Sequence, residues 1–148
     1  MATHDNASGR RFDAFRLARE RGLLEGELDA ATLSRVAERL TSRPAMVHWR
    51  IRGTADAMGR PALSVEVDGE VPLQCQRCLE QVRVPIGQQT EVVLAHSEGE
   101  LARLDEEIAS EVLLAVAPVD PLVLVEDELV LSLPYVARHA DESCGIAQ

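Results

Sequence analysis

The sequence predicts an α+β fold: an antiparallel sheet with a long hairpin tipped by a Cys-x-x-Cys turn, packed by two amino-terminal helices and one carboxy-terminal helix. Two observations carry this prediction. The middle of the chain alternates apolar and polar residues with a period of two, which is typical of half-buried strands. The segments on either side place apolar residues at helical spacing instead. We expect a single domain over residues 10–144, after a disordered start over 1–9 and before a tail over 145–148.

The amino-terminal elements follow from local spacing. Residues Phe12–Arg21 carry apolar side chains at near-helical spacing, which predicts a first helix. The segment Leu24–Leu28 could form a short strand. A second helix is expected up to Leu40, with Asp29 or Thr32 as its N-cap.

The central strands are predicted from strict alternation. Residues 47–52 alternate, and residues 62–75 place their apolar side chains at odd positions. A two-residue hairpin at Asp68-Gly69 would put apolar and polar residues on the same face, so a continuous strand with Gly69 as a bulge is favoured. Alternation resumes over residues 82–94, which predicts the second arm of a hairpin. The two cysteines lie between these arms.

The last third of the chain combines an acidic connector with one strong helix signal. Residues 97–110 are expected to form a mobile acidic connector with at most a short helical turn, and residues 111–117 could add a strand. Asp120-Pro121 predicts a helix start, because Asp caps free amides and Pro fits the first turn. A buried helix over 122–133 would end before Pro134. Its β-branched residues leave a strand as the alternative.

The charge is unevenly distributed. The net charge is −10, and all fifteen basic residues are arginine. Residues 1–60 hold eleven arginines against eight acids, giving +3, whereas residues 61–148 hold four against seventeen, giving −13. So acidic a surface is repelled by nucleic acid except at a local basic face. The acids are otherwise explained as a solvated, solubilising surface.

One basic cluster stands out near the amino terminus. Its candidate contact residues for phosphate or an acidic partner are Arg11, Arg16 and Arg19. The alternative is the solvated face of an amphipathic helix.

Several classes of protein are disfavoured. No apolar run approaches the ~20 residues of a membrane helix, and the polar start is no signal peptide, so we expect a cytoplasmic protein without membrane contact. The sequence contains no Gly-x-Ser-x-Gly, His-Glu-x-x-His or phosphate-binding glycine loop. We therefore do not expect an enzyme.

The cysteines offer the clearest candidate site. Cys75 and Cys78 have the spacing of a metal knuckle or a redox pair. A redox pair is expected at a helix start, whereas the residues after Cys78 alternate as a strand, which favours one structural zinc ion. His139 and Cys144 would complete four ligands, if the fold brings the tail under the hairpin tip. Unligated thiols and a cysteine–histidine nucleophile pair remain alternatives.

The motif residues also resemble a known family. Leu73-Gln-Cys-Gln-Arg-Cys-Leu-Glu80, followed by Glu126-Asp-Glu-Leu-Val-Leu-Ser-Leu-Pro134 and then by His139 and Cys144, is similar to the YceD family over residues 10–144. The resemblance implies a small cytoplasmic, non-enzymatic factor that supports maturation or stability of 23S ribosomal RNA. The family is also described as metal-binding, and its motif cysteines correspond to Cys75 and Cys78. Arg77 and Glu80, within the first motif, are further candidates for contact with RNA or a partner.

Two function classes remain open at this point. The first is an assembly factor that touches 23S rRNA through the arginine-bearing amino-terminal face. The second is an acidic adaptor that holds a basic large-subunit ribosomal protein or an rRNA-processing enzyme and makes no direct contact with RNA. The charge of −13 over residues 61–148 favours the adaptor for most of the surface.

Overall fold

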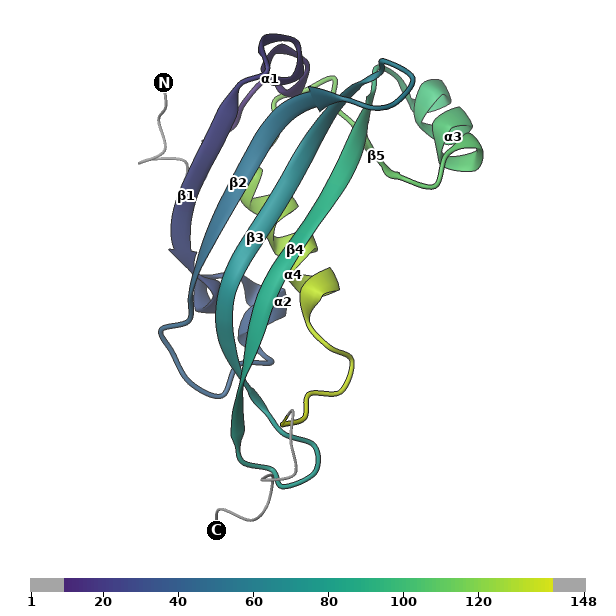
Figure 1. Ribbon diagram of the computed structural model, residues 1–148. Coiled ribbons are helices and arrows are strands. Elements are labelled where there is room, and N and C mark those ends of the chain that lie inside the picture. Colours follow the sequence, from purple (N-terminus) through teal and green to yellow (C-terminus); the bar gives the residue numbers. More distant parts are fainter. Residues whose placement is uncertain (1–9, 140–148) are drawn as a thin grey trace.

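The computed structural model describes residues 10–139 and is built on a five-stranded sheet (Figure 1). The predicted disordered start and tail, and Cys144, lie outside the described residues. The strands are β1 (Leu23–Asp29), β2 (Met46–Ala55), β3 (Pro61–Gln74), β4 (Gln81–Ala95) and β5 (Glu111–Leu114). The helices are α1 (Ala14–Glu20), α2 (Ser34–Ala37), α3 (Glu98–Glu107) and α4 (Pro121–Ser132), with a 3₁₀ turn, η2 (Ala30–Thr32), before α2. The α+β class is confirmed.

The sheet is mixed, so the prediction of a purely antiparallel sheet is wrong. Its order is β1-β2-β3-β4-β5, and the first four strands pair antiparallel. Strand β5 instead pairs parallel to β4, from Val92↔Glu111 to Ala95↔Leu114. A parallel neighbour requires a crossover, and α3 supplies it between the two strands.

Strands β3 and β4 form the longest ladder of the sheet. They pair from Ala62↔Val93 to Gln74↔Gln81, and residues 75–80 join them. Strand β3 runs unbroken through Asp68-Gly69, as the alternation predicts. Gly69 has φ +148°, a conformation that side chains rarely adopt. Beyond Gly69 neither β2 nor β5 accompanies the ladder, so it continues as a two-stranded ribbon to the cysteines.

The main core lies on one face of the sheet. Helices α1, α2 and α4 cover this face, and the largest side chains that are fully buried beneath them include Trp49, Ile51, Leu63 and Leu129. A second, smaller apolar cluster lies on the opposite face, where Ala62, Val93 and Ala95 pack against Leu104 of α3. The sheet is therefore covered fully on one side and only at the β4–β5 end on the other.

Helix α3 corrects the prediction of a mobile connector over residues 97–110. Ser97 accepts a hydrogen bond from the Glu100 amide at 3.1 Å, and Glu100 accepts one from the His96 amide at 2.6 Å. These reciprocal bonds fix the first turn of the helix. Leu101, Leu104 and Ile108 then pack against the sheet.

The other helices begin and end for local reasons. Asp13 caps α1 by accepting the Arg16 amide at 3.1 Å, and Asp120 caps α4 by accepting the Leu122 amide at 2.9 Å. Helix α2 is shorter than the predicted helix that ended at Leu40. Asp29 accepts the amides of Ala31 and Ala45, so the chain before α2 takes a 3₁₀ turn rather than a helical one.

One carboxylate lies inside the main core. Glu128 of α4 is 3% exposed, and the Thr90 hydroxyl donates a hydrogen bond to it at 2.8 Å. Burial raises the pKa of Glu128 above its ordinary value, and the nearby charges of Glu111 and Asp127 add to this effect. The folded state therefore binds this proton more tightly than the unfolded chain does.

We expect Glu128→Gln to change how stability depends on pH. The contribution of Glu128 is fully present below its unfolded pKa of about 4.5 and is lost as pH rises through the raised folded pKa. Glutamine keeps the acceptor for Thr90 and carries no charge, so the variant should gain stability relative to the wild type as pH rises from acid to neutral. Urea unfolding across that range measures the difference. Glu106→Gln, at an exposed site on α3, is the control; parallel curves for wild type and Glu128→Gln would contradict the expectation.

Candidate functional site

The turn between β3 and β4 holds both cysteines in a tight backbone. The Cys75 amide donates to the carbonyl of Glu80, and the Leu79 amide donates to the carbonyl of Cys75, both at 2.8 Å. Leu79 closes the turn in the left-handed conformation, with φ +65°. Cys75 is fully buried, whereas Cys78 is partly exposed. The turn thus presents one buried and one accessible thiol.

The segment after α4 returns to this turn, as the course of the chain in Figure 1 shows. The Gln76 amide donates to the carbonyl of Ala137 at 2.9 Å, and Ala137 is buried. Further back, Arg39 donates to the carbonyl of Pro134 at 2.9 Å. These bonds deliver His139 to the cysteines across a separation of 61 residues from Cys78.

Three potential metal ligands meet at the turn. One ligand atom each from Cys75, Cys78 and His139 lies within 4.8 Å of the others, and Cys78 Sγ lies 3.6 Å from His139 Nδ1. In tetrahedral zinc, sulfur and imidazole nitrogen are about 3.5 Å apart and two sulfurs about 3.8 Å. Two thiols and one imidazole are also ligands that zinc favours. The described residues therefore fit a zinc ion, whereas the predicted fourth ligand, Cys144, lies outside them.

The competing interpretations of the cysteines find less support. The chain continues from Cys78 into β4, and in the described part of the chain no helix begins at either cysteine. A thioredoxin-like pair depends on a helix start to lower the thiol pKa. Within residues 10–139 no carboxylate bonds to His139, so the Cys78–His139 pair has no orienting third group there.

The other predicted contact residues lie at two separate ends of the molecule. Arg16 and Arg19 belong to α1, and Arg11 lies just before it. Figure 1 shows α1 at one end of the sheet and the β3–β4 turn, which carries Arg77 and Glu80, at the other. All five side chains are exposed. The structure therefore does not bring the two groups of candidates together.

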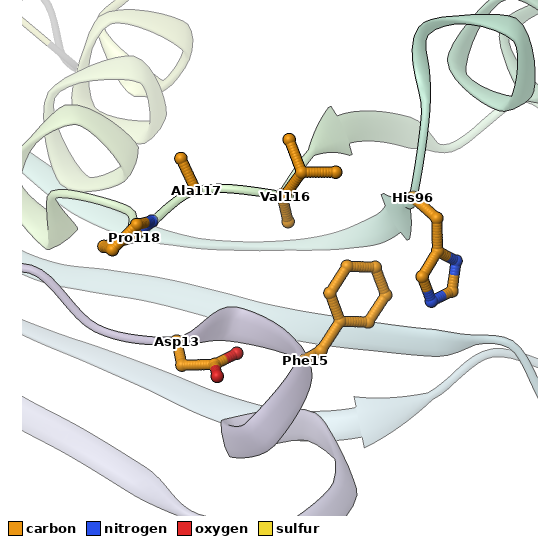
Figure 2. Close-up of a pocket in the computed structure, with 7 residues that line it drawn as sticks. Asp13, Phe15, His96, Val116, Ala117 and Pro118 are labelled. Carbon is orange, nitrogen blue, oxygen red and sulfur yellow. The ribbon is translucent and has the colours of Figure 1, made fainter.

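A ring pair beside α1 was not predicted from the sequence. Phe15 and His96 stack with their ring centroids 4.0 Å apart, and Figure 2 shows them at a hollow of about 420 Å³. A second hollow, of about 430 Å³, lies against the same two residues and is lined also by Arg19 and Arg21. His96 falls in the segment that was expected to be a connector, which is why it was missed. Phe15 was assigned only to the apolar face of a helix.

Helix α3 fixes the histidine of this pair. Glu100 accepts the backbone amide of His96 and also lies 3.1 Å from its Nδ1. The bond from the His96 amide is the largest of the effects that hold the pKa of Glu100 below its ordinary value. The ring of His96 is thus held against Phe15 by a charged partner, with much of its surface open to solvent.

Comparison with known proteins gives one match. Among the described residues no helix is long and apolar enough to span a membrane. No curated protein and no solved structure matches the chain. The model of the family described as large ribosomal RNA subunit accumulation protein YceD matches residues 63–148, which is more than half of the chain and includes the Cys75–Cys78 turn and α4. The chain therefore belongs to the YceD family, and its role is in the accumulation of large-subunit ribosomal RNA.

Proposed function

We propose that this protein is a non-enzymatic cytoplasmic factor that supports accumulation of 23S rRNA during large-subunit assembly. Membership of the YceD family carries the proposal. The geometry adds two specific parts, a metal-fastened hairpin tip and an arginine-bearing end. Each part has its own test.

The first part is a structural zinc ion held by Cys75, Cys78 and His139, with Cys144 as the fourth ligand. The support is that three favoured ligands from distant parts of the chain meet within 4.8 Å. Zinc would join the β3–β4 turn to the segment after α4, which backbone bonds already bring together. Its role in this proposal is to hold a shape rather than to catalyse a reaction.

The second part is contact with RNA at the α1 end. Within residues 10–139 no ion pair engages Arg11 or Arg19, whereas Arg16 pairs with Glu20 at 3.1 Å. Free guanidinium groups bind phosphate, and stacked rings such as Phe15 and His96 provide a surface for unpaired bases. This end is the local basic face that an otherwise acidic protein needs.

We expect Arg11→Glu with Arg19→Glu to weaken binding of single-stranded 23S rRNA fragments. Loss of two phosphate contacts lowers the slope of log affinity against log salt by about 1.4. Fluorescence anisotropy over a series of salt concentrations measures the slope. The matched control is Arg43→Glu with Arg83→Glu, which changes the net charge equally at exposed sites away from α1. Equal effects of the two double variants would remove direct RNA contact at α1 from the proposal.

The second candidate function is the acidic adaptor for a basic ribosomal protein or processing enzyme. One observation favours it: several arginines outside α1 are already paired with acids of the same chain, as in Arg50–Glu66 at 3.1 Å and Arg60–Asp56 at 2.8 Å. The remaining acids leave a large negative surface. Retention of a ribosomal protein in pull-downs that contain no RNA would support the adaptor and argue against the α1 contact.

A further inference from the structure

A narrow groove lies between α4 and the β4–β5 end of the sheet. Its free volume is about 90 Å³. The walls are mainly apolar, and three carboxylates stand among them. The lining residues are Val65, Thr90, Val92, Glu111, Val112, Leu113, Leu124, Asp127, Glu128 and Leu131.

The three carboxylates differ in what they already bind. Asp127 is paired with Arg35, and Glu111 is exposed at the rim. Glu128 is 97% buried, and Thr90 donates to its Oε2. No donor within residues 10–139 reaches its Oε1. A buried carboxylate with an open acceptor position is unfavourable unless a cation or donor is supplied.

The size and lining of the groove select the kind of cation. A volume of 90 Å³ holds about three groups of the size of a water molecule. Apolar walls around one carboxylate suit a primary ammonium with its last methylenes, because such a side chain buries its stem along apolar surface. A hydrated divalent ion needs several oxygen ligands instead of valines and leucines.

The occupant has to come from another protein. This chain contains no lysine, so neither its own side chains nor a second copy can supply that group. Access exists along the sheet: β5 pairs only with Val92–Ala95 of β4, so residues 81–91 of β4 have no partner strand on that side among the described residues. Thr90 lies on this open stretch, where an extended segment can approach.

We propose that this groove receives a lysine side chain from a basic protein, with the ammonium group bound by Glu128 and Glu111 and the methylenes packed against Val92 and Leu124. The proposal deepens the adaptor function, on which it rests, by naming the residue that the adaptor recognises. It does not depend on RNA contact at α1 or on zinc at the hairpin tip.

The test is binding of an octalysine peptide by the full chain, measured by isothermal titration. Glu128→Gln removes the charge and keeps the shape of the side chain, and it is expected to weaken binding by about tenfold. Glu106→Gln removes the same charge from an exposed site on α3 and should change binding less than about twofold. An octaarginine peptide should bind the wild type more weakly than octalysine does, because the planar guanidinium group exceeds the groove.

Amide shifts locate the bound probe and guard against misfolding. With Nα-acetyl-lysine amide, the shifts are expected to fall on Thr90, Glu111 and Glu128, and to be absent with the uncharged norleucine analogue. Glu111→Gln, at the exposed rim, provides a second variant should Glu128→Gln fail to fold. Equal losses for Glu106→Gln and the groove variants, or shifts spread over the acidic surface, would overturn the proposal. Loss of pull-down of ribosomal proteins with the groove binding intact would reject the adaptor function alone.

Discussion

Removal of zinc is expected to lower the midpoint of thermal unfolding by about 10 °C. A ligand present at a thousand times its Kd stabilises the folded state by about 4 kcal/mol, and each kcal/mol shifts the midpoint of a chain of this size by about 2–4 °C. Protein purified without chelator should carry about one zinc ion per chain. Elemental analysis and calorimetry before and after treatment with a chelator measure both quantities.

Variants separate the metal from the thiols themselves. Cys78→Ser should lose the ion and match the chelated wild type, because Cys78 is partly exposed and its replacement leaves no core cavity. Arg77→Ser, an exposed change between the two cysteines, is the control and should keep the metal. Cys144→Ser tests the fourth ligand. Metal-free protein that is fully folded and insensitive to chelator would show that the cysteines are turn residues only.

Gly53→Ala is expected to destabilise the fold by about 3 kcal/mol or more, because α1 lies directly on the backbone of β2. A Cβ atom at Gly53 would lie 2.0 Å from the carbonyl oxygen of Leu17 and 2.7 Å from the Cα of Ala18. Both are backbone atoms, so no side chain can turn aside to relieve the contact. The Gly53 amide also donates to Gly22 at 2.8 Å, which fixes the strand at this distance from the helix.

Denaturant unfolding measures the effect, and hydrogen exchange shows whether the amides of α1 lose protection first. Gly87→Ala is the matched control, since no atom lies within 4 Å of a Cβ built there. It should unfold within about 0.5 kcal/mol of the wild type. A Gly53→Ala variant as stable as this control would mean that α1 does not sit on β2 as described.

The elements that could be predicted are those whose signal is local. The alternation of residues 62–75 excluded a break at Asp68-Gly69, and Asp120-Pro121 marked the start of α4. Helix α3 was missed because its acids outweighed a sparse apolar stripe, although Ser97 and Glu100 form a capping pair. Parallel pairing of β5 was missed because a four-residue strand shows no direction in its sequence.

The candidate site shows the same limit. Spacing alone places Cys75 and Cys78 on one turn, but it cannot place His139, which arrives through the path of the chain after α4. The partnership of Phe15 with His96 depends on how α1 and α3 pack at one end of the sheet. Glu128 looked like part of a solvated stripe on a helix, since burial of a single acid depends on the neighbouring strand rather than on its own segment.

The β3–β4 ladder also sets a length. Strand β3 has fourteen residues, which extend about 45 Å at the usual rise of a strand. Because the arginine-bearing helix and the cysteine turn lie toward opposite ends of this ladder, the strand pair acts as a spacer of fixed span. Two partners that each grip one end would be kept that far apart, so this small protein can measure out a distance on a much larger particle.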